Sequence, residues 1–423
     1  MSLADRVVVT EVLDRWLRDT RRMIHMQPEL LLDEELTSEL VRKHLTEIGV
    51  PFRARVGGDG RSLYTSHDAL ERAGIKTRPV TGGTGVLGEV KGTRGAGPGK
   101  TILLRADMDA LPLTELNDVP YKSQVPGKMH ACGHDLHTTV LMGVAEVLSG
   151  LTDTFDGTVK FMFQPAEEGA GGAAAMIHDG IMENPPVDAA FALHVSTDCG
   201  PGQISVNTGP SAASADMIEI HITGKGGHAA FPHTTVDTTL VAAHIMIALQ
   251  TLVAREVSPM DTAVVSIGKL ESGTIHNIIP HTASMLGTVR TYNEDVRDFL
   301  EKRITEIVPA IAAAFRAEAE VVYLRGYPAM VNDAEMADLA REVGRELLGA
   351  DNVLPGAAMM AGEDMAFVLQ KVPGCLFSLG VGNPDKGFIY PPHHPRFDAD
   401  EDALAVGVRM LSGIALRYLQ ADV

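Results

Sequence analysis

The segment MHACGHDLH contains residue types that bind transition metals. Cys132 and His134 are separated by one residue and lie just before a predicted helix. A thiolate there gains from the positive end of the helix dipole, and both side chains can reach one metal centre. Sulfur beside an imidazole favours zinc or a similar ion. A cysteine and a histidine at this spacing, taken alone, are more often part of a helix-capping loop with a buried free cysteine. The interpretation therefore depends on the other segments.

The segment QPAEEGAGG places two adjacent carboxylates at the end of an apolar strand. Neighbouring side chains at a strand end point in different directions, so one can bind a metal while the other faces water. We assign Glu168 as a metal ligand and Glu167 as a general base. A metal lowers the pKa of bound water, and Glu167 can take its proton and pass it to a leaving amine. The alternative is a solvated acidic turn.

Histidines supply further candidate ligands. His194 ends the apolar strand AAFALHV, where a core histidine is common, but its place at the strand terminus favours a ligand. PPHHPRF offers His393 and His394 in a loop stiffened by proline, and spacing alone leaves the choice between them open. We interpret His130 and His137 as residues of the pocket or of the helix surface.

The segment RADMDALPLTE adds Asp107 and Asp109 directly after the strand TILLR. Both could bind metal directly. Ligating histidines usually have a carboxylate behind them, and we predict this supporting role for Asp109.

These segments follow the ends of predicted strands. From Thr101 onward the apolar strands TILLR, TVKFMF and AAFALHV alternate with the helical pattern HDLHTTVLMGVAEVLSG. This alternation predicts a parallel sheet covered by helices on both faces, with ligands at the carboxyl ends of the strands. Two amphipathic helices that end near Pro28 and Gly49 are expected to pack on the sheet.

The pattern changes after CGPGQISVNTGPSAAS, where a second domain is expected to begin. Ile218, Ile220 and Ile222 alternate with polar residues, as in a half-exposed strand. The elements that follow are a helix near 236–255, strands near 264–270 and 283–292, a helix near 294–316 and the strand AEVVYL. Their order, β-α-β-β-α-β, is that of a split-βαβ sandwich. The last hundred residues are expected to complete the first domain.

Composition excludes several classes of protein. The 36 basic and 55 acidic side chains give a net charge of -19, which repels nucleic acid and anionic membranes. Asp5 and Glu11 interrupt the N-terminus where a signal peptide needs an apolar run. The segment VAAHIMIALQTLVA is too short to span a bilayer, so we expect a buried helix and no membrane span. Cys132, Cys199 and Cys375 are odd in number and widely spaced, which indicates a reducing compartment.

Eight motifs, in order, resemble the M20 metallopeptidase family, and more narrowly its branch of N-acyl-amino-acid, hippurate and auxin-conjugate amidohydrolases. They are RADMDALPLTE, HACGHDLH, QPAEEG, LHV, GKGGHAAFPH, HNIIP, GTVRT and HHPRFDADE. The resemblance implies a mixed-sheet α/β catalytic domain, residues 1–209 and 326–423, interrupted by a ferredoxin-like α+β dimerisation domain, residues 210–325.

The resemblance also implies two divalent metal ions per subunit, zinc or manganese, with Glu167 as the base. The implied metal ligands are Cys132, His134, Glu168, His194 and His393. The family pattern thereby selects His393 over His394.

For the smaller domain, the resemblance implies that His228 in GKGGHAAFPH stabilises a tetrahedral oxyanion and comes from the partner subunit of a homodimer. Asn277 in HNIIP and Arg290 in GTVRT resemble binders of the substrate carboxylate, which a planar guanidinium suits. Their alternatives are a strand-end cap and a surface salt-bridge partner.

The implied activity is hydrolysis of N-acyl or N-aroyl amino acids by a cytoplasmic homodimer. One alternative is a dipeptidase or carboxypeptidase of the same metal chemistry. Another is a non-catalytic metal-binding or ligand-binding protein, which the intact Glu167 disfavours. The stretch from Arg55 to Gly88 is longer than the link expected in this branch, and an insertion there could alter specificity or assembly.

Overall fold

The computed structural model describes residues 2–58, 83–95 and 99–420, and its chain divides into two compact units. The first unit is Met1–Gly209, Val331–Ala357 and Asp364–Val423, and the second is Pro210–Met330 and Ala358–Glu363. The short strands β7 (Gly209–Ala212) and β14 (Met330–Asn332) mark two of the places where the chain passes between the units. Most of the insertion expected between Arg55 and Gly88, including its helical piece SHDALERAG, lies outside the described residues.

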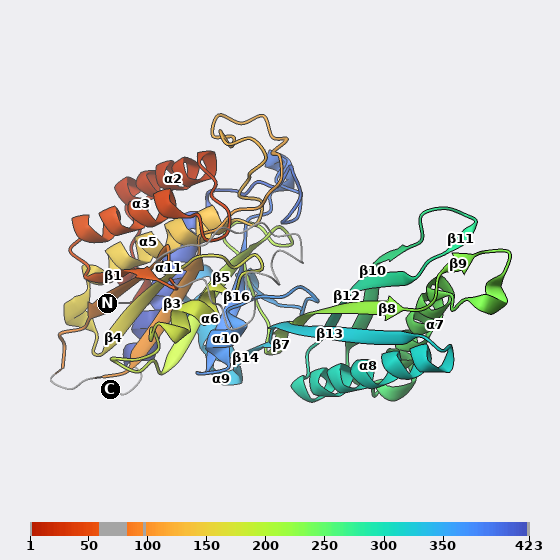
Figure 1. The fold of residues 1–423 in the computed structure, drawn as a ribbon. Helices are drawn as coiled ribbons and strands as arrows, with labels where there is room; N and C mark the ends of the chain where they lie inside the picture. Colours follow the sequence, from red (N-terminus) through yellow and green to blue (C-terminus); the bar gives the residue numbers. More distant parts are fainter. Residues whose placement is uncertain (1, 59–82, 96–98, 421–423) are drawn as a thin grey trace. The chain divides into compact units, whose positions relative to one another are not determined.

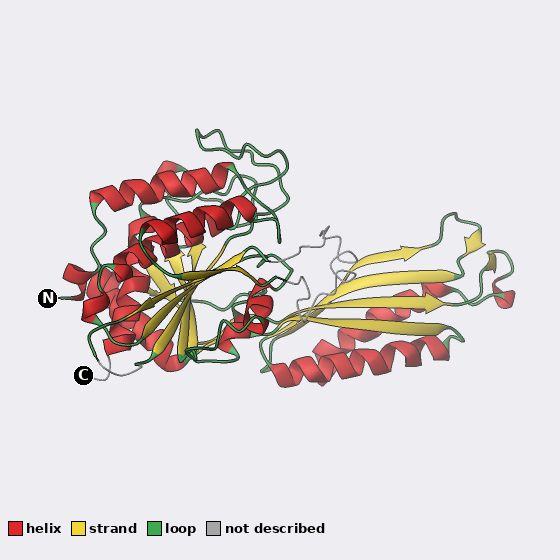
Figure 2. Cartoon of the chain, turned by 60° about the vertical axis from the view of Figure 1, so that its left-hand side comes forward, coloured by secondary structure: helices red, strands yellow, loops and turns green. Residues whose placement is uncertain are grey.

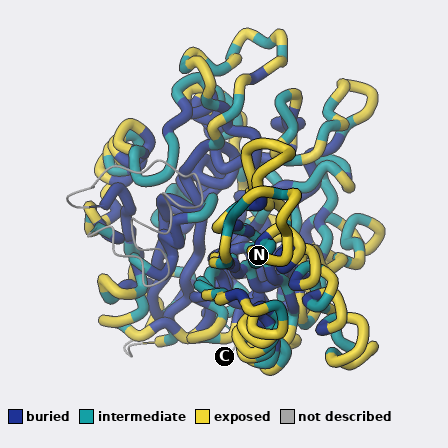
Figure 3. Tube along the Cα trace, turned by 45° about the vertical axis from the view of Figure 1, so that its right-hand side comes forward, coloured by how far each residue is buried: buried dark blue, intermediate teal, exposed yellow. Residues whose placement is uncertain are grey.

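An eight-stranded mixed sheet forms the centre of the first unit (Figure 1), in the order β1-β2-β4-β3-β5-β16-β6-β15. The strands are β1 (Phe52–Val56), β2 (Gly85–Lys91), β3 (Thr101–Asp107), β4 (Thr158–Gln164), β5 (Ala189–Ser196), β6 (Ile204–Val206), β15 (Val353–Pro355) and β16 (Gly374–Gly380). The strands predicted at TILLR, TVKFMF and AAFALHV are β3, β4 and β5. Both β3 and β4 are buried along their whole length, as is most of the interior trace in Figure 3.

The expectation of a parallel sheet holds only for its centre, where β4, β3, β5 and β16 are parallel. β1 and β2 pair antiparallel with their neighbours, and β6 runs antiparallel to β16. Parallel neighbours need a crossover, which the helices after β3 and β4 supply. β6 instead follows β5 after a short connection, residues 197–203, that reverses the chain.

Helices cover both faces of this sheet. They are α1 (Leu3–Arg6), α2 (Glu11–Met26), α3 (Glu35–Glu47), α5 (His134–Ser149), α6 (Gly172–His178), α9 (Ala334–Leu348), α10 (Ala366–Leu369) and α11 (Ala403–Gln420). Side chains alternate along β3, so Ile102 and Leu104 join the apolar core that α5 and α11 cover. Arg105 points to the other face, where it bonds Asp364 just before α10.

The two N-terminal helices are α2 and α3, as the amphipathic pattern predicts. α2 begins after Thr10, whose side chain accepts a hydrogen bond from the backbone N–H of Leu13, and ends shortly before Pro28. Leu13 and Leu17 are buried on its inner face, whereas Val12 is 77% exposed.

A glycine brings the start of α5 against the end of β5. Gly133 precedes α5 with φ 84°, and a Cβ there would lie 2.4 Å from Cγ2 of Val195. Only glycine permits both this conformation and this approach. As a result, His134 at the start of α5 lies beside His194 on β5.

The second unit contains a four-stranded antiparallel sheet in the order β10-β12-β8-β13, with two helices on one of its faces (Figure 2). Its elements are β8 (Ala215–Thr223), β9 (Gly227–His228), α7 (Thr238–Thr251) with a π turn (Leu252–Glu256), β10 (Ala263–Ser272), β11 (Ile278–Ile279), β12 (Thr282–Thr291), α8 (Glu294–Ala314) and β13 (Glu318–Tyr327). Apart from the short β9–β11 pair, the element order is the predicted one.

The prediction of a buried helix at VAAHIMIALQTLVA is wrong for one face of α7. Ile245 and Leu249 are buried against the sheet, but Leu240 and Ile247 are 49% and 67% exposed. Within the described part of the chain, one helix, Thr238–Glu256, is long and apolar enough to cross a membrane, and 33% of its apolar window is buried. One such helix is weak evidence for a membrane span.

Candidate metal centre

The five predicted metal ligands come from four segments that meet at the carboxyl edge of the central strands. Cys132 and His134 lie at the start of α5, His194 lies on β5, and Glu168 and His393 lie in loops. The ligand atoms of Cys132, His134 and His194 lie within 4.8 Å of one another, and so do those of Cys132, Glu168 and His393. Cys132 belongs to both groups, an arrangement that suits two neighbouring ions sharing one sulfur ligand. Two more free cysteines, Cys199 and Cys375, are buried elsewhere.

The facing atoms within this cluster are close. Sγ of Cys132 lies 3.4 Å from Nε2 of His194, and Nε2 of His393 lies 3.1 Å from Oε1 of Glu168. Nε2 of His134 is buried and has no hydrogen-bond partner among the described residues. Leaving such a nitrogen unsatisfied costs free energy, so an imidazole aimed at thiol and carboxylate ligands fits a bound metal ion.

The electrostatics of the cluster favour positive charge. Burial acts to lower the pKa of His134, but Asp107 and Cys132 raise it well above its usual value. Cys132, and then Glu168, raise the pKa of His393 to about 10. Burial acts to raise the pKa of Glu168, yet His393 and His134 hold it below its usual value. Surroundings that stabilise imidazolium ions also stabilise divalent cations, which displace those protons on binding.

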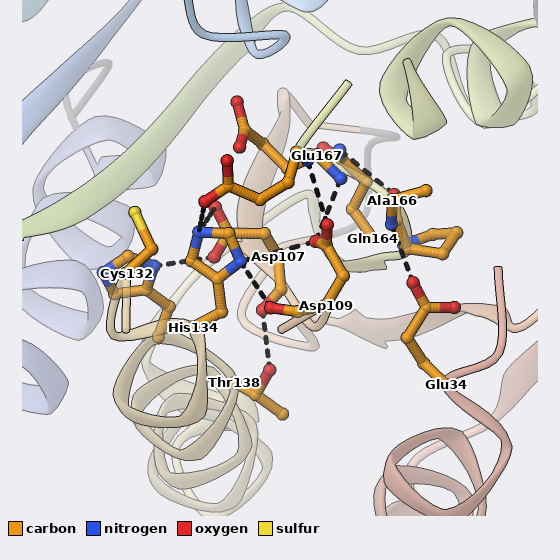
Figure 4. A network of polar contacts seen from close by, with 12 residues as sticks. Glu34, Asp107, Asp109, Cys132, His134, Thr138, Gln164, Ala166 and Glu167 are labelled. Carbon is orange, nitrogen blue, oxygen red and sulfur yellow. Dashed lines mark hydrogen bonds and ion pairs between the residues drawn. The ribbon is translucent and has the colours of Figure 1, made fainter. Parts of the chain in front are cut away.

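Asp109 supports His134 through its main chain. Nδ1 of His134 donates to the backbone carbonyl of Asp109 at 2.8 Å, whereas the Asp109 carboxylate is 3.4 Å away. This carboxylate instead accepts the backbone N–H groups of Glu167 and Glu168, each at 2.9 Å (Figure 4). It therefore orients the loop that carries the candidate base and a candidate ligand.

Asp107, the alternative ligand, lies between other partners. Its Oδ1 accepts from Nδ1 of His137 at 2.6 Å, and its Oδ2 is 2.8 Å from Nη1 of Arg105. His137 is buried, so the helix surface is excluded as its place, and the same holds for His130. Burial lowers the pKa of His137 to about 4, and its neutral Nε2 accepts the backbone N–H of Val195 at 2.9 Å. His137 thus holds the end of β5 next to the candidate ligand on that strand.

Glu167 lies beside the candidate ligands. It is buried, and its carboxylate is within 4.8 Å of the ligand atoms of His134 and Glu168. A carboxylate at this position can exchange a proton with water at the metal centre.

The two histidines of the late motif point to different places. His393 adopts φ 66° and donates its backbone N–H to the carbonyl of Ala131 at 2.7 Å, which ties its loop to the Cys132 segment. His394 stacks on Tyr390 with ring centroids 4.4 Å apart. The structure therefore brings His393, and not His394, to Glu168.

The candidate residues of the second unit fall into two places. His228 is exposed on β9, and the backbone N–H of Ala229 donates to the carbonyl of Asn277, so these two candidates are neighbours. Arg290 is half-buried at the far end of β12 from Thr282, and burial lowers its pKa against the opposing effect of Asp216. Thr282 and Arg290, near the two ends of β12, are eight residues apart along the strand, which corresponds to about 26 Å. Arg290 and Asn277 of one chain therefore cannot hold the same carboxylate.

Sequence reasoning missed a group of buried charges behind the site. Arg105 on β3 donates to Gln164 at 2.8 Å and to Asp364 at 2.9 Å, and Asp364 also accepts the backbone N–H of Ala173 in α6. Arg105 thereby connects β3, β4 and α6 behind Asp107. A charged residue inside the apolar run TILLR was the available signal.

A second buried group fixes the start of α5. Arg21 lies 2.9 Å from Asp135, the residue after His134, and Nδ1 of His25 is 2.7 Å from the same carboxylate. Burial acts to raise the pKa of Asp135, but Arg21 and then His25 lower it far below its usual value. Arg21 follows Leu17 by four residues on the apolar face of α2, so a charge at a core position was again visible in the sequence.

The chain has similar sequences and structures among known proteins. Residues 103–417 match the model of peptidase family M20/M25/M40. The chain is 36% identical to the IAA-amino acid hydrolase ILR1-like 4 of Arabidopsis thaliana, covering 96% of this chain and 86% of the relative. It is 38% identical to thermostable carboxypeptidase 2 of Saccharolobus solfataricus, over 97% of both chains. It is 35% identical to the N-acetyl-L-cysteine deacetylase of Bacillus subtilis, over 97% and 90% of the two chains.

Among solved structures, the chain is similar to YXEP of Bacillus subtilis, described as a dinuclear metal binding peptidase of the M20 family. The TM-score is 0.79 with 32% sequence identity, and the match covers 97% of this chain and 99% of that one. The similarity extends over both units, so the fold as a whole corresponds.

Proposed function

The chain belongs to peptidase family M20/M25/M40 and is a metal-dependent amide hydrolase, and we propose that its substrates are N-acyl or N-aroyl amino acids. The products would be a carboxylic acid and a free amino acid. The names of two relatives, an IAA-amino acid hydrolase and an N-acetyl-L-cysteine deacetylase, support this substrate class.

The observation that carries the proposal is the cluster of sulfur, imidazole and carboxylate ligands beside a buried second carboxylate. The residues that would hold two divalent ions, zinc or manganese, are Cys132, His134, Glu168, His194 and His393. When bound, such ions acidify water and polarise a carbonyl group. Mixed sulfur and nitrogen donors accept several divalent metals, so availability decides which one is used.

Glu167 acts as the general base and then as the general acid. Its carboxylate removes a proton from the attacking water and delivers it to the leaving nitrogen, which departs as the amine of the amino acid. The two hydrogen bonds from the Glu167 and Glu168 amides to Asp109 hold this loop still during both transfers.

Substrate recognition uses the second unit. Arg290 and Asn277 bind the carboxylate of the amino acid, and His228 stabilises the oxyanion. Because Arg290 and Asn277 of one chain lie too far apart for one carboxylate, we place them in the site from different subunits of a homodimer. His228, the neighbour of Asn277, then acts on the partner's metal centre.

A dimer is supported by apolar surface on the second unit. Leu240 and Ile247 on α7 are half to two-thirds exposed, and Leu270 lies on β10, an edge strand of the sheet. Unpaired strand edges and exposed apolar side chains suit association with a second copy. Mixing His228→Ala with Glu167→Gln tests the arrangement, because heterodimers regain one intact site only if His228 acts across the dimer. No recovery in confirmed heterodimers refutes it.

A dipeptidase or carboxypeptidase activity is the second candidate, supported by the similarity to a thermostable carboxypeptidase. The test compares N-acetyl-L-methionine and N-benzoylglycine with dipeptides at equal Mn2+ or Zn2+ and measures the free amino acid released. Faster hydrolysis of the acyl amino acids supports the proposal, and a preference for dipeptides selects the alternative. Release of product by Glu167→Gln at the wild-type rate contradicts the mechanism.

We also propose that the protein is cytoplasmic and binds neither nucleic acid nor membranes. Three free cysteines suit the reducing cytoplasm, and a net charge of -19 disfavours nucleic acid and anionic membranes as partners. Fractionation of cells that express the chain tests this, and recovery in the membrane fraction contradicts it.

A further inference from the structure

Glu34 is a buried carboxyl group that the chemistry described above does not use. It occupies the N-cap position of α3, yet its side chain makes no capping hydrogen bond to that helix. Its Oε1 accepts the backbone N–H groups of Ala166 and Leu32, each at 3.0 Å. Its Oε2 accepts from the hydroxyl of Thr84 at 2.6 Å. The side chain therefore reaches from α3 to the loop that follows β4.

Glu34 and Asp109 together bind three successive amides of this loop. Glu34 accepts from Ala166, and the two oxygens of Asp109 accept from Glu167 and Glu168 (Figure 4). The side chains of Glu34 and Asp109 thus hold every backbone N–H from the residue before the candidate base to the candidate ligand.

The conformation of Ala166 explains why the loop needs this restraint. Ala166 has φ 56°, in the left-handed region that side chains other than glycine rarely adopt. The turn it makes sets the direction in which the next residue, Glu167, leaves the backbone. Such conformations persist where the surroundings enforce them, and the hydrogen bond from Ala166 to Glu34 is one such contact.

We propose that Glu34 is a positioning residue that keeps the Ala166 turn in place and so aims Glu167 at the reacting groups. The inference rests on the proposed role of Glu167 as the base. Burial, and then the charge of Asp109, raise the pKa of Glu34 to about 8.

A purely structural role for Glu34 at the start of α3 is already filled by another carboxylate. Glu29 is buried and accepts the backbone N–H groups of Leu36 and Thr37, both at 2.9 Å. No hydrogen bond of the Glu29 side chain in the described structure reaches the loop after β4. Glu29→Ala is therefore a matched control that weakens α3 without releasing Ala166.

The experiment measures kcat, KM, metal content and backbone exchange for the full-length enzyme loaded with Mn2+, using N-benzoylglycine and N-acetyl-L-methionine. Glu34→Ala is expected to lower kcat about 10- to 100-fold with KM little changed and metal content unchanged. Hydrogen exchange in a peptide spanning residues 163–169 should become faster. Glu34→Gln keeps an oxygen for Ala166 and should restore most of kcat. Glu29→Ala should leave kcat unchanged, and hydrogen exchange in that peptide should stay as slow as in the wild type.

Three results overturn the inference: wild-type kcat in folded Glu34→Ala, an equal loss of kcat in Glu29→Ala, or no rescue in Glu34→Gln. If Glu34→Ala does not fold, Glu34→Asp carries the test, because its shorter side chain draws the oxygen away from Ala166. Unchanged kcat in Glu34→Asp then refutes the idea. Glu167→Gln is measured in parallel. Activity in that variant contradicts the proposed function itself. An inactive Glu167→Gln together with wild-type kcat in Glu34→Ala contradicts only the positioning role.

Discussion

Replacing Asp109 with asparagine is the sharpest single perturbation of the loop that carries Glu167, the proposed base. The Asp109 carboxylate is 1% exposed and accepts the Glu167 and Glu168 amides, both at 2.9 Å. An asparagine side chain there would keep one acceptor oxygen but turn an NH2 donor toward the second amide. One charge-assisted hydrogen bond, of about 1.5–3 kcal/mol, is lost and a buried N–H loses its partner. We expect Asp109→Asn to lower the free energy of unfolding by about 2–4 kcal/mol.

The assay separates stability from catalysis. Urea unfolding of the metal-free protein measures the loss of stability without any contribution from metal binding. Turnover of N-benzoylglycine by the Mn2+-loaded protein should fall by about 100-fold, because Glu167, the proposed base, is no longer held in position. Asp118→Asn, an exposed change in the same connecting segment, is the control and should shift stability by less than about 0.5 kcal/mol. Wild-type stability in Asp109→Asn would refute the reasoning.

Three further predictions concern other parts of the chain. Burial lowers the pKa of His44, so below about pH 6.5 the unfolded chain binds a proton that the folded chain resists, and the free energy of unfolding falls with acid. Urea unfolding at several pH values should show a smaller fall in His44→Gln than in the wild type, and an equal fall contradicts this. Asp216→Asn breaks a buried ion pair with Arg297 and should lower the free energy of unfolding by about 3–5 kcal/mol, measured by denaturant unfolding. The exposed Asp298→Asn should lower it by less than about 1 kcal/mol in the same measurement. Burial raises the pKa of Cys375 to about 12, so iodoacetamide should leave its thiol unmodified in the native protein, as measured by mass spectrometry. Alkylation of Cys375 before unfolding contradicts this.

Hydrophobic periodicity is sufficient to predict most of the elements. The strands β3, β4 and β5 and the helices α2, α3 and α5 lie where apolar runs and amphipathic patterns predict them. The antiparallel edges of the large sheet are not predictable, because pairing direction depends on contacts between segments remote in sequence. α7 is apolar all round, which predicts burial, but composition cannot tell which face the rest of the chain covers.

The candidate site was predictable only in part. The motif segments contained the residues that the structure brings together, yet spacing could not choose between His393 and His394, which differ in backbone conformation and stacking. The buried partners Arg21, Arg105 and Glu34 were missed because their roles depend on carboxylates and amides far away in the sequence. For Arg21 and Arg105, a charged residue at an apolar position was the local signal, and it identifies burial without identifying the partner.

We propose that five side chains hold two metal ions, and that amide hydrolysis with Glu167 as the base requires these ions. The most direct measurement titrates the metal-free protein with Mn2+ and follows both bound metal and release of glycine from N-benzoylglycine, or of methionine from N-acetyl-L-methionine. We expect no release without metal, full activity at two bound ions per chain, and two bound ions without turnover in Glu167→Gln. Product release by the metal-free protein, or turnover by metal-loaded Glu167→Gln at the wild-type rate, would contradict it.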